Sequence, residues 1–201
     1  MDLTQRREKI VSIATRMFIE QGYAATTLEA IGAAAGVTKR TMYELVGDKQ
    51  AIFAAACNSM RAEGPGFQFD IVLTDRSAQD VMHQMARQLI NHCLEKELIT
   101  LERAVIVEAV NNEQIVRISV GESRDNQFLV ISKIFDALIA ANLLAPMETL
   151  TAARIFYDAT VGARGFRAVL GLPPEAASDE EIELRINMFI HGYINRIAPG
   201  R

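Results

Sequence analysis

Apolar residues recur at intervals of three and four along most of the chain, which is the period of an amphipathic α-helix. The first such stripe predicts a helix over residues 4–21, and its members are Ile10, Ile13, Ala14, Met17 and Phe18. Strand-like alternation of any length and hairpin signals do not follow the break at Gly64-Pro65-Gly66. The pattern therefore predicts an all-α protein.

Further helices follow from the same periodicity. Asp48 is placed to cap a helix that runs to about Glu63. Beyond it, the expected helices cover residues 77–96, 100–118, 122–142, 147–170 and 179–197. We expect residues 1–47 to form a three-helix domain and residues 48–201 to form a larger helical domain.

Two short helices joined by a tight turn are predicted between residues 26 and 45. Thr26 and Glu29 have the spacing of a capping box, which predicts the start of the first short helix. Gly36 suits the left-handed backbone that commonly ends a helix, so it predicts a sharp turn. Thr38 is a favourable cap for the second short helix.

The second short helix opens with groups that read DNA. Lys39, Arg40, Thr41 and Tyr43 supply two cations, a hydroxyl and a phenol within its first turns. A recognition helix places its N-terminal residues on base edges in the major groove. The two helices therefore predict a helix-turn-helix that binds DNA, although a solvated helix hairpin has the same local pattern.

These residues resemble the N-terminal domain of the TetR family of bacterial transcriptional regulators. The resemblance runs from about residue 10 to Lys49 and keeps the family's order and spacing, through Gly22-Tyr23, Thr26-Thr27, Ile31, Ala35-Gly36-Val37-Thr38 and Thr41-Met42-Tyr43. It implies that Lys39, Arg40 and Tyr43 approach bases. It also implies that Thr27, Thr41 and Lys49 hold phosphates, with Thr38 beside them as the cap.

Three positions depart from the usual pattern of the family. Arg40 replaces a small residue, Leu45 replaces a residue that often touches phosphate, and Val46 replaces a packed Phe. The fork of an Arg side chain matches the O6 and N7 atoms of guanine, so Arg40 favours a guanine contact. The Leu45 side chain has no polar group for the phosphate contact, and an extra Arg in the groove would partly offset this loss.

Charge supports DNA binding through one end of the chain. The net charge is −4, but residues 1–60 carry seven Lys and Arg against six Asp and Glu. The remaining residues carry fourteen against nineteen. A weakly positive N-terminal part on an acidic body fits a protein that meets DNA at that part only.

Composition narrows the class of protein further. No apolar run reaches the length of a membrane span, and the charged N-terminus lacks the apolar region of a signal peptide, so we expect a cytoplasmic protein. Cys57 and Cys93 form no metal or disulfide motif and are expected to be buried thiols, with a redox role for Cys93 beside His92 as the alternative. No cofactor is expected.

The last two expected helices are candidates for forming a homodimer. Ile186, Phe189, Ile190 and Tyr193 belong to an apolar stripe wider than a surface helix needs. Gly162 and Gly165 on the preceding helix allow another helix to approach closely. Ordinary core packing is the alternative. A dimer is favoured because two DNA-binding domains related by a two-fold axis read both halves of a palindromic operator.

The larger domain is longer than is needed merely to hold two DNA-binding domains together, so we expect it to bind a small-molecule effector. Candidate residues for an apolar cavity are Met82, Met85, Leu89, Phe128, Ile131, Phe135, Phe156 and Tyr157. Such a stripe is also typical of an ordinary core. The resemblance implies a repressor that leaves its operator when the effector binds.

Two other classes of protein are alternatives to a ligand-responsive repressor. An enzyme would need a convergent catalytic or metal-binding set, and no such motif occurs in the sequence, so the chain is not expected to be an enzyme. The second alternative is an architectural or partner-recruiting DNA-binding protein without a small ligand. Release from DNA by a ligand separates this alternative from a ligand-responsive repressor.

Overall fold

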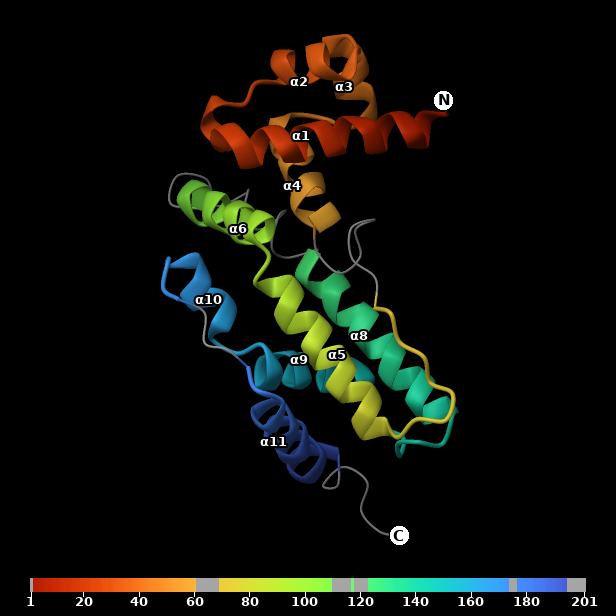
Figure 1. The fold of residues 1–201 in the computed structure, drawn as a ribbon. Coiled ribbons are helices and arrows are strands. Elements are labelled where there is room, and N and C mark those ends of the chain that lie inside the picture. Colours follow the sequence, from red (N-terminus) through yellow and green to blue (C-terminus); the bar gives the residue numbers. More distant parts are fainter. Residues whose placement is uncertain (1, 61–68, 110–116, 118–122, 174–176, 195–201) are drawn as a thin grey trace. The chain divides into compact units, whose positions relative to one another are not determined.

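The computed structural model describes residues 2–60, 69–109, 117, 123–173 and 177–194, and these contain helices but no strand (Figure 1). The all-α prediction is therefore confirmed. The chain divides into two compact units, Met1–Phe67 with Lys96–Asp125, and Gln68–Glu95 with Asn126–Arg201. This packing division differs from the functional boundary expected after residue 47, which stays a prediction.

The first unit is built on α1, Leu3–Ala25, whose buried face includes Ile10, Ala14 and Phe18. Asp2 caps its start, where the Asp2 carboxylate accepts a hydrogen bond from the backbone N–H of Gln5 at 2.8 Å. The backbone leaves helical geometry at Gly22, where φ is 81°, so the straight part ends close to the predicted residue 21.

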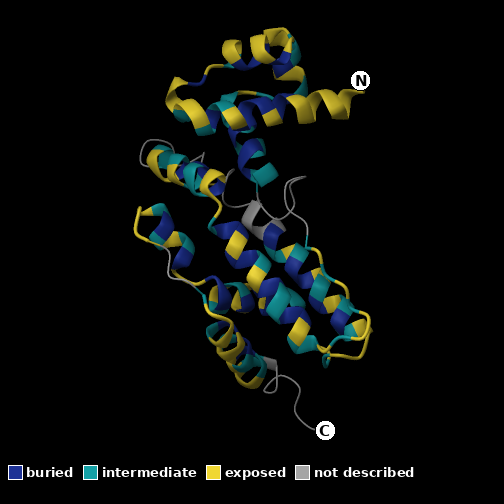
Figure 2. Cartoon of the chain, in the orientation of Figure 1, coloured by how far each residue is buried: buried dark blue, intermediate teal, exposed yellow. Residues whose placement is uncertain are grey.

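Two short helices, α2 (Leu28–Ala35) and α3 (Lys39–Leu45), pack on α1. Gly36 ends α2 with φ 70° and ψ 36°, the left-handed conformation that the sequence predicts. The Thr38 hydroxyl accepts a hydrogen bond from the backbone N–H of Thr41, so Thr38 caps α3 as expected. Figure 2 shows exposed positions on the outer faces of α2 and α3 and buried positions toward α1.

The predicted capping box at the start of α2 is wrong. The N-cap is Thr27, whose hydroxyl accepts from the backbone N–H of Ala30 at 3.1 Å. Thr26 is fully buried, and its hydroxyl donates to the carbonyl of Gly22 at 2.8 Å. The Thr26 side chain therefore stabilises the C-terminal end of α1 and does not cap α2. Glu29 takes no part in a capping box, so its carboxylate is available for another contact.

Two later helices complete the first unit. α4, Lys49–Met60, packs on α1 and is capped by Asp48, whose carboxylate accepts from the N–H of Ala51 at 2.8 Å. α6, Lys96–Ala109, contacts both α1 and α4. Its Leu101 and Val105 are buried in the same core as Phe18 and Phe53. The predicted helix over 100–118 therefore begins earlier, and most of its end lies outside the described residues.

The second unit is a core of helices α5 (Ala78–Cys93), α8 (Ser123–Ala140), α9 (Thr149–Thr160) and α11 (Asp179–Phe189). Their buried faces meet in one apolar cluster. Within it, the Phe135 and Phe156 rings form an edge-to-face pair with centroids 5.6 Å apart. Ile190–Ile194 continues α11 as a short π-helical turn, so the predicted helix over 179–197 is described as far as residue 194.

An extended segment precedes α5, which the sequence pattern did not predict. Phe69, Ile71 and Leu73 pack against the core of the second unit, while Val72 between them is 59% exposed. Side chains of α5 hold this segment, because the side-chain amides of Gln84 and Gln88 both donate to the carbonyl of Asp70. The inward side of the segment therefore completes the core without forming a strand.

The predicted continuous helix over 147–170 is wrong. α9 ends at Thr160, and a separate short helix, α10, covers Arg164–Val169. Gly162 lies between them with φ 52°, a backbone conformation that other residues adopt only with strain. Among the described residues, no helix is long and apolar enough to cross a membrane.

Candidate nucleic-acid interface

The seven residues expected to contact DNA all belong to the first unit, at α2, α3 and the start of α4. They are Thr27, Thr38, Lys39, Arg40, Thr41, Tyr43 and Lys49. The first turn of α3 is exposed at Thr38, Lys39 and Arg40. Met42, on the opposite face of α3, is fully buried in the core of the unit. The core therefore fixes the helix and leaves its polar face open.

Lys39 forms an ion pair across the helix-turn-helix. Its ammonium lies 2.6 Å from the Oε1 atom of Glu29 on α2, and both side chains are exposed. The hydrogen bond from Lys39 holds the pKa of the Glu29 carboxyl below its usual value, and the same bond raises the pKa of Lys39. Both groups are therefore charged at neutral pH. To bind an acceptor on DNA, the Lys39 ammonium would have to give up or share its contact with the Glu29 carboxylate.

Arg40 and Tyr43 are accessible on the same helix. The Arg40 side chain is 88% exposed, and its Nε atom donates to the Glu44 carboxylate at 2.8 Å. Tyr43 is half exposed. The pair between Arg40 and Glu44 is an exposed contact one helical turn apart, and such pairs contribute little to stability. Arg40 is therefore available for a stronger contact.

The three residues expected at phosphates have different local roles. The Thr27 hydroxyl caps α2, and the Thr41 hydroxyl lies 3.0 Å from that of Thr38. Lys49 donates to the carbonyl of Ala24 and sits 4.3 Å from the centre of the Tyr23 ring. Partial burial lowers the pKa of Lys49. Lys49 therefore also fastens the start of α4 to the end of α1.

The two departures at the end of α3 are absorbed by packing. Val46 is buried in the core of the first unit, where the resemblance expects a Phe. Leu45 is half-buried and packs against the same core. Val46 therefore occupies the buried position expected for the Phe. Leu45 stabilises α3 by packing its side chain against the same core.

The eight residues expected to line an effector cavity come together in the second unit. Six of them, Met82, Met85, Leu89, Ile131, Phe135 and Phe156, have no exposed surface. The other two, Phe128 and Tyr157, are half-buried and meet edge to face with ring centroids 5.7 Å apart. Cys93 is buried as expected, and its Sγ atom lies 3.3 Å from the Tyr157 hydroxyl. These residues therefore form a packed apolar core.

The residues expected at a dimer interface divide between core and surface. Ile186 and Phe189 are buried in the core of the second unit, and Ile190 and Tyr193 are half-buried against it. An apolar cleft of about 670 Å³ lies along α9 and α11. It is lined by Ile155, Ala159, Glu181, Leu184, Arg185, Met188, Phe189, Gly192 and Tyr193. Leu184 and Met188 are 59% and 66% exposed, and the sequence analysis had not singled them out.

Gly162 and Gly165 do not approach a neighbouring helix within the second unit as closely as their size would allow. A Cβ atom at Gly165 would meet nothing within 4 Å. At Gly162 it would lie 3.4 Å from the carbonyl of Asp158, which is an ordinary contact distance. The positive φ at this position, rather than a lack of space, therefore accounts for the glycine.

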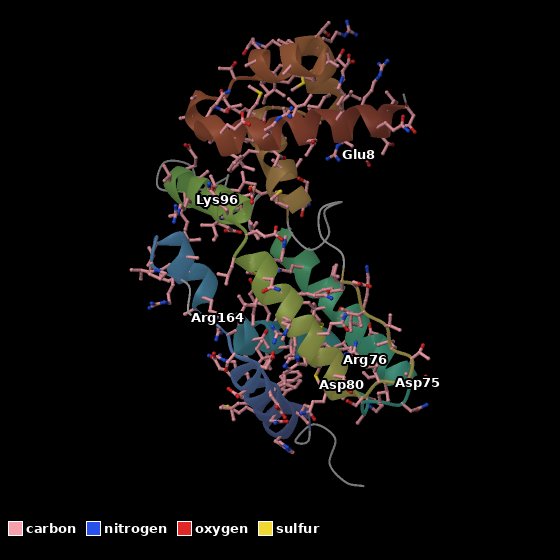
Figure 3. The ribbon with its side chains drawn as sticks, in the orientation of Figure 1. Glu8, Asp75, Arg76, Asp80, Lys96 and Arg164 are labelled. Atoms are coloured by element: carbon pink, nitrogen blue, oxygen red, sulfur yellow. The ribbon has the colours of Figure 1, made fainter. Side chains whose placement is uncertain are left out.

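A charged cluster beside the cleft also escaped the sequence analysis. Arg164, at the start of α10 (Figure 3), is 3% exposed, and its guanidinium donates to a Glu181 oxygen at 2.5 Å and to the carbonyl of Thr160. Arg185 donates to the same Glu181 oxygen at 2.9 Å. The bond from Arg164, followed by that from Arg185, lowers the pKa of Glu181. Three charges therefore fix α10 against α11.

The first unit thus has the arrangement of helix-turn-helix proteins that bind DNA. Residues 10–56 match the family model described as bacterial regulatory proteins, tetR family. Residues 80–195 match the model of the AefR-like transcriptional repressor C-terminal domain. The chain belongs to the TetR family of bacterial transcriptional regulators, as the sequence motifs indicate. The family consists of regulators, so the expectation that the chain is not an enzyme is confirmed.

Individual relatives agree with this assignment. The HTH-type transcriptional regulator YerO of Bacillus subtilis (strain 168) is 31% identical over 55 residues, which is 27% of this chain and 19% of YerO. The match thus spans about a fifth of that relative. A TetR regulator from Agrobacterium tumefaciens has the same fold, with TM-score 0.72, 18% identity and 96% of each chain covered. The flavonoid-responsive regulator FrrA gives TM-score 0.67, 22% identity, and coverage of 98% of this chain and 100% of FrrA.

Proposed function

We propose that this protein is a cytoplasmic, sequence-specific DNA-binding repressor that acts as a homodimer and leaves its operator when a small molecule binds its second unit. The proposal that the protein binds DNA is supported above all by the exposed face of α3. The first two turns of α3 present Lys39, Arg40 and Tyr43 to solvent, while Met42 anchors the opposite face in the core. A rigid helix with an exposed cationic first turn is what a major-groove reader requires.

A second copy of the chain is the proposed occupant of the apolar cleft on α9 and α11. Leu184 and Met188 expose apolar surface on α11, and Ile155 continues this surface on α9. Glu181 and Arg185 give the cleft a polar side, as in protein interfaces with an apolar centre and a polar rim. A two-fold dimer would supply two α3 helices for the two halves of a palindrome.

The proposed effector site lies among α5, α8 and α9, at the eight residues that form the packed core. Met82 and Met85 have flexible side chains that adapt to irregular shapes, so a ligand can enter by rearranging them. Phe128 and Tyr157 are half-buried and mark the accessible edge of this region. FrrA is a flavonoid-responsive protein of the same fold, which supports an effector of small-molecule size.

Coupling from the effector site to the DNA-binding unit is proposed to run through α6. Only Leu94 and Glu95 separate the end of α5 from the start of α6. α6 in turn buries Leu101 and Val105 in the core that supports α2 and α3. A ligand that favours a different position of α5 would therefore act on the DNA-binding core, provided its affinity differs between the two states.

The test is a selection of duplexes from a random library by the purified protein. The proposal predicts enrichment of an inverted repeat whose half-sites are separated by about one helical turn of DNA, 10–10.5 base pairs. A screen of small molecules on the enriched duplex then tests release. An enriched operator that no compound releases would favour the architectural alternative, and failure to enrich any sequence would contradict sequence-specific binding.

A further inference from the structure

A second cationic site lies beside the helix-turn-helix. A cleft of about 280 Å³ opens between the first turns of α1 and the turn that joins α2 to α3. Its lining residues are Arg6, Lys9, Ile10, Ala35, Gly36, Val37, Thr38 and Thr41. Two cations and two hydroxyl groups thus line the cleft, and no acidic residue does. Arg6 and Lys9 precede the residues that match the family model.

Lys9 is held in position by the end of α2. Its ammonium donates to the carbonyl of Ala35 at 3.1 Å, across 26 residues of sequence. An ammonium group has three donors, so two stay available for another acceptor. The bond also places a positive charge at the carbonyl end of α2, where the helix dipole favours it. Lys9 is therefore oriented before any ligand arrives.

Arg6 lies one turn before Lys9 on the same face of α1. The cap at Asp2 fixes this turn, since the N–H of Arg6 also donates to the Asp2 carbonyl at 3.1 Å. Glu8 lies on the side of α1 away from α2 and α3 (Figure 3), and its carboxylate does not line the cleft. A guanidinium and an ammonium on a preformed backbone, beside two hydroxyls, make an anion site suited to a phosphate.

We propose that Arg6 and Lys9 bind a phosphate of the DNA backbone next to the groove entered by α3. This inference rests on the proposed function, because the cleft shares Thr38 and Thr41 with the first turn of the recognition helix. Thr41, expected at a phosphate from the resemblance, would serve the same phosphate as the two cations. The contact reads no bases, so it positions α3 and strengthens binding to every duplex alike.

The test compares the double variant Arg6→Ala/Lys9→Ala with wild type on a selected duplex and on a scrambled one, across a salt series. We expect binding to both duplexes to weaken about tenfold or more, and the slope of log affinity against log salt to become shallower by about 1 to 2. Lys9→Gln alone keeps the side-chain length and should show a smaller loss. Arg7→Ala is the matched control, because Arg7 carries the same charge next to Arg6 without lining the cleft. Circular dichroism confirms that each variant is folded.

The outcomes separate this inference from the proposed function. Arg6→Ala, measured as a single variant beside the double one, removes the same charge as Arg7→Ala. Equal losses for these two single variants would show a general charge effect and overturn the site, as would unchanged binding of the double variant. If wild type binds both duplexes equally and the double variant weakens both, the phosphate site stands and sequence-specific reading fails. Inorganic phosphate at matched ionic strength should displace no more duplex than chloride. Phosphate binding to the cleft that leaves affinity for the duplex unchanged would assign the cleft to a free anion and overturn the backbone contact.

Discussion

The ammonium of Lys39 and the carboxylate of Glu29 lie 2.6 Å apart, which joins the first residue of the recognition helix to the helix before it. Both side chains are exposed, so the carboxylate of Glu29 is accessible from solvent beside Lys39. A DNA contact by Lys39, as proposed, would break or share this pair and bring a phosphate backbone near a negative charge.

Replacing Glu29 with Gln should increase affinity for DNA about threefold to tenfold at 0.1 M salt, because it frees Lys39 and removes a charge that repels phosphates. Fluorescence anisotropy with a selected duplex measures this change. Glu20→Gln, at an exposed position on α1, is the control for net charge. A loss of affinity in Glu29→Gln would instead mean that Glu29 orients Lys39 for its base contact.

Replacing Arg40 with Ala should relax sequence preference at one base pair in each half-site. The expected loss of discrimination is about 1–3 kcal/mol at that position, the range for a bidentate Arg contact with guanine. Binding to a panel of duplexes with single substitutions measures it, and Glu44→Ala controls for loss of the pair with Arg40. Unchanged discrimination across the panel would exclude a base contact by Arg40.

Replacing both Leu184 and Met188 with Glu should convert the proposed dimer to a monomer. Burying the new carboxylates in the apolar cleft would weaken the dimer at least ~30-fold, as removal of two interface anchors does. Light scattering at micromolar protein concentration gives the mass directly. Leu129→Glu, at an exposed position of α8, should leave the mass unchanged. A wild-type monomer at this concentration would contradict the proposed interface.

Replacing Glu181 with Gln should destabilise the second unit by about 2 kcal/mol at pH 7, because it leaves the guanidinium of Arg164 buried without its carboxylate. This figure is below the range for fully buried pairs, since a third of the Glu181 side chain is exposed. Urea unfolding measures the change in the free energy of unfolding, with the exposed Glu183→Gln as the control.

The same substitution predicts a pH dependence. The pKa of Glu181 is lowered in the folded protein, so its contribution to stability is fully present above its ordinary value of about 4.5. The contribution is lost as pH falls through the lowered folded value. Wild type and Glu181→Gln should therefore differ most above about pH 5 and converge in more acidic solution. A difference that stays constant down to pH 3 would mean that the ion pair is not its source.

Local signals in the sequence predicted the helix-turn-helix well. Gly36 and Thr38 act through their own backbone conformation and their nearest neighbours, so their roles follow from residue type and spacing. Thr26 and Thr27 are adjacent and chemically identical, and only the tertiary structure decides that Thr26 turns inward to the Gly22 carbonyl. A capping pattern could not distinguish between them.

Features that depend on contacts between distant segments escaped the sequence analysis. The bond between Lys9 and Ala35 spans 26 residues, and that between Arg164 and Glu181 spans 17. The break at Gly162 was missed because apolar periodicity continues through it, although α9 and α10 are separate helices. The apolar stripe on α11 was recognised, but Leu184 and Met188 lie outside it, and their exposure emerged only from the packing of the helix.

The most direct test of the central claim is the binding of the purified wild-type protein to the DNA that flanks its own gene. Fluorescence anisotropy would compare this fragment with a scrambled duplex across a salt series. The account predicts tight binding that prefers the native fragment and weakens steeply as salt rises. Equal and weak binding to the fragment and to the scrambled duplex, repeated with a duplex library, would contradict it.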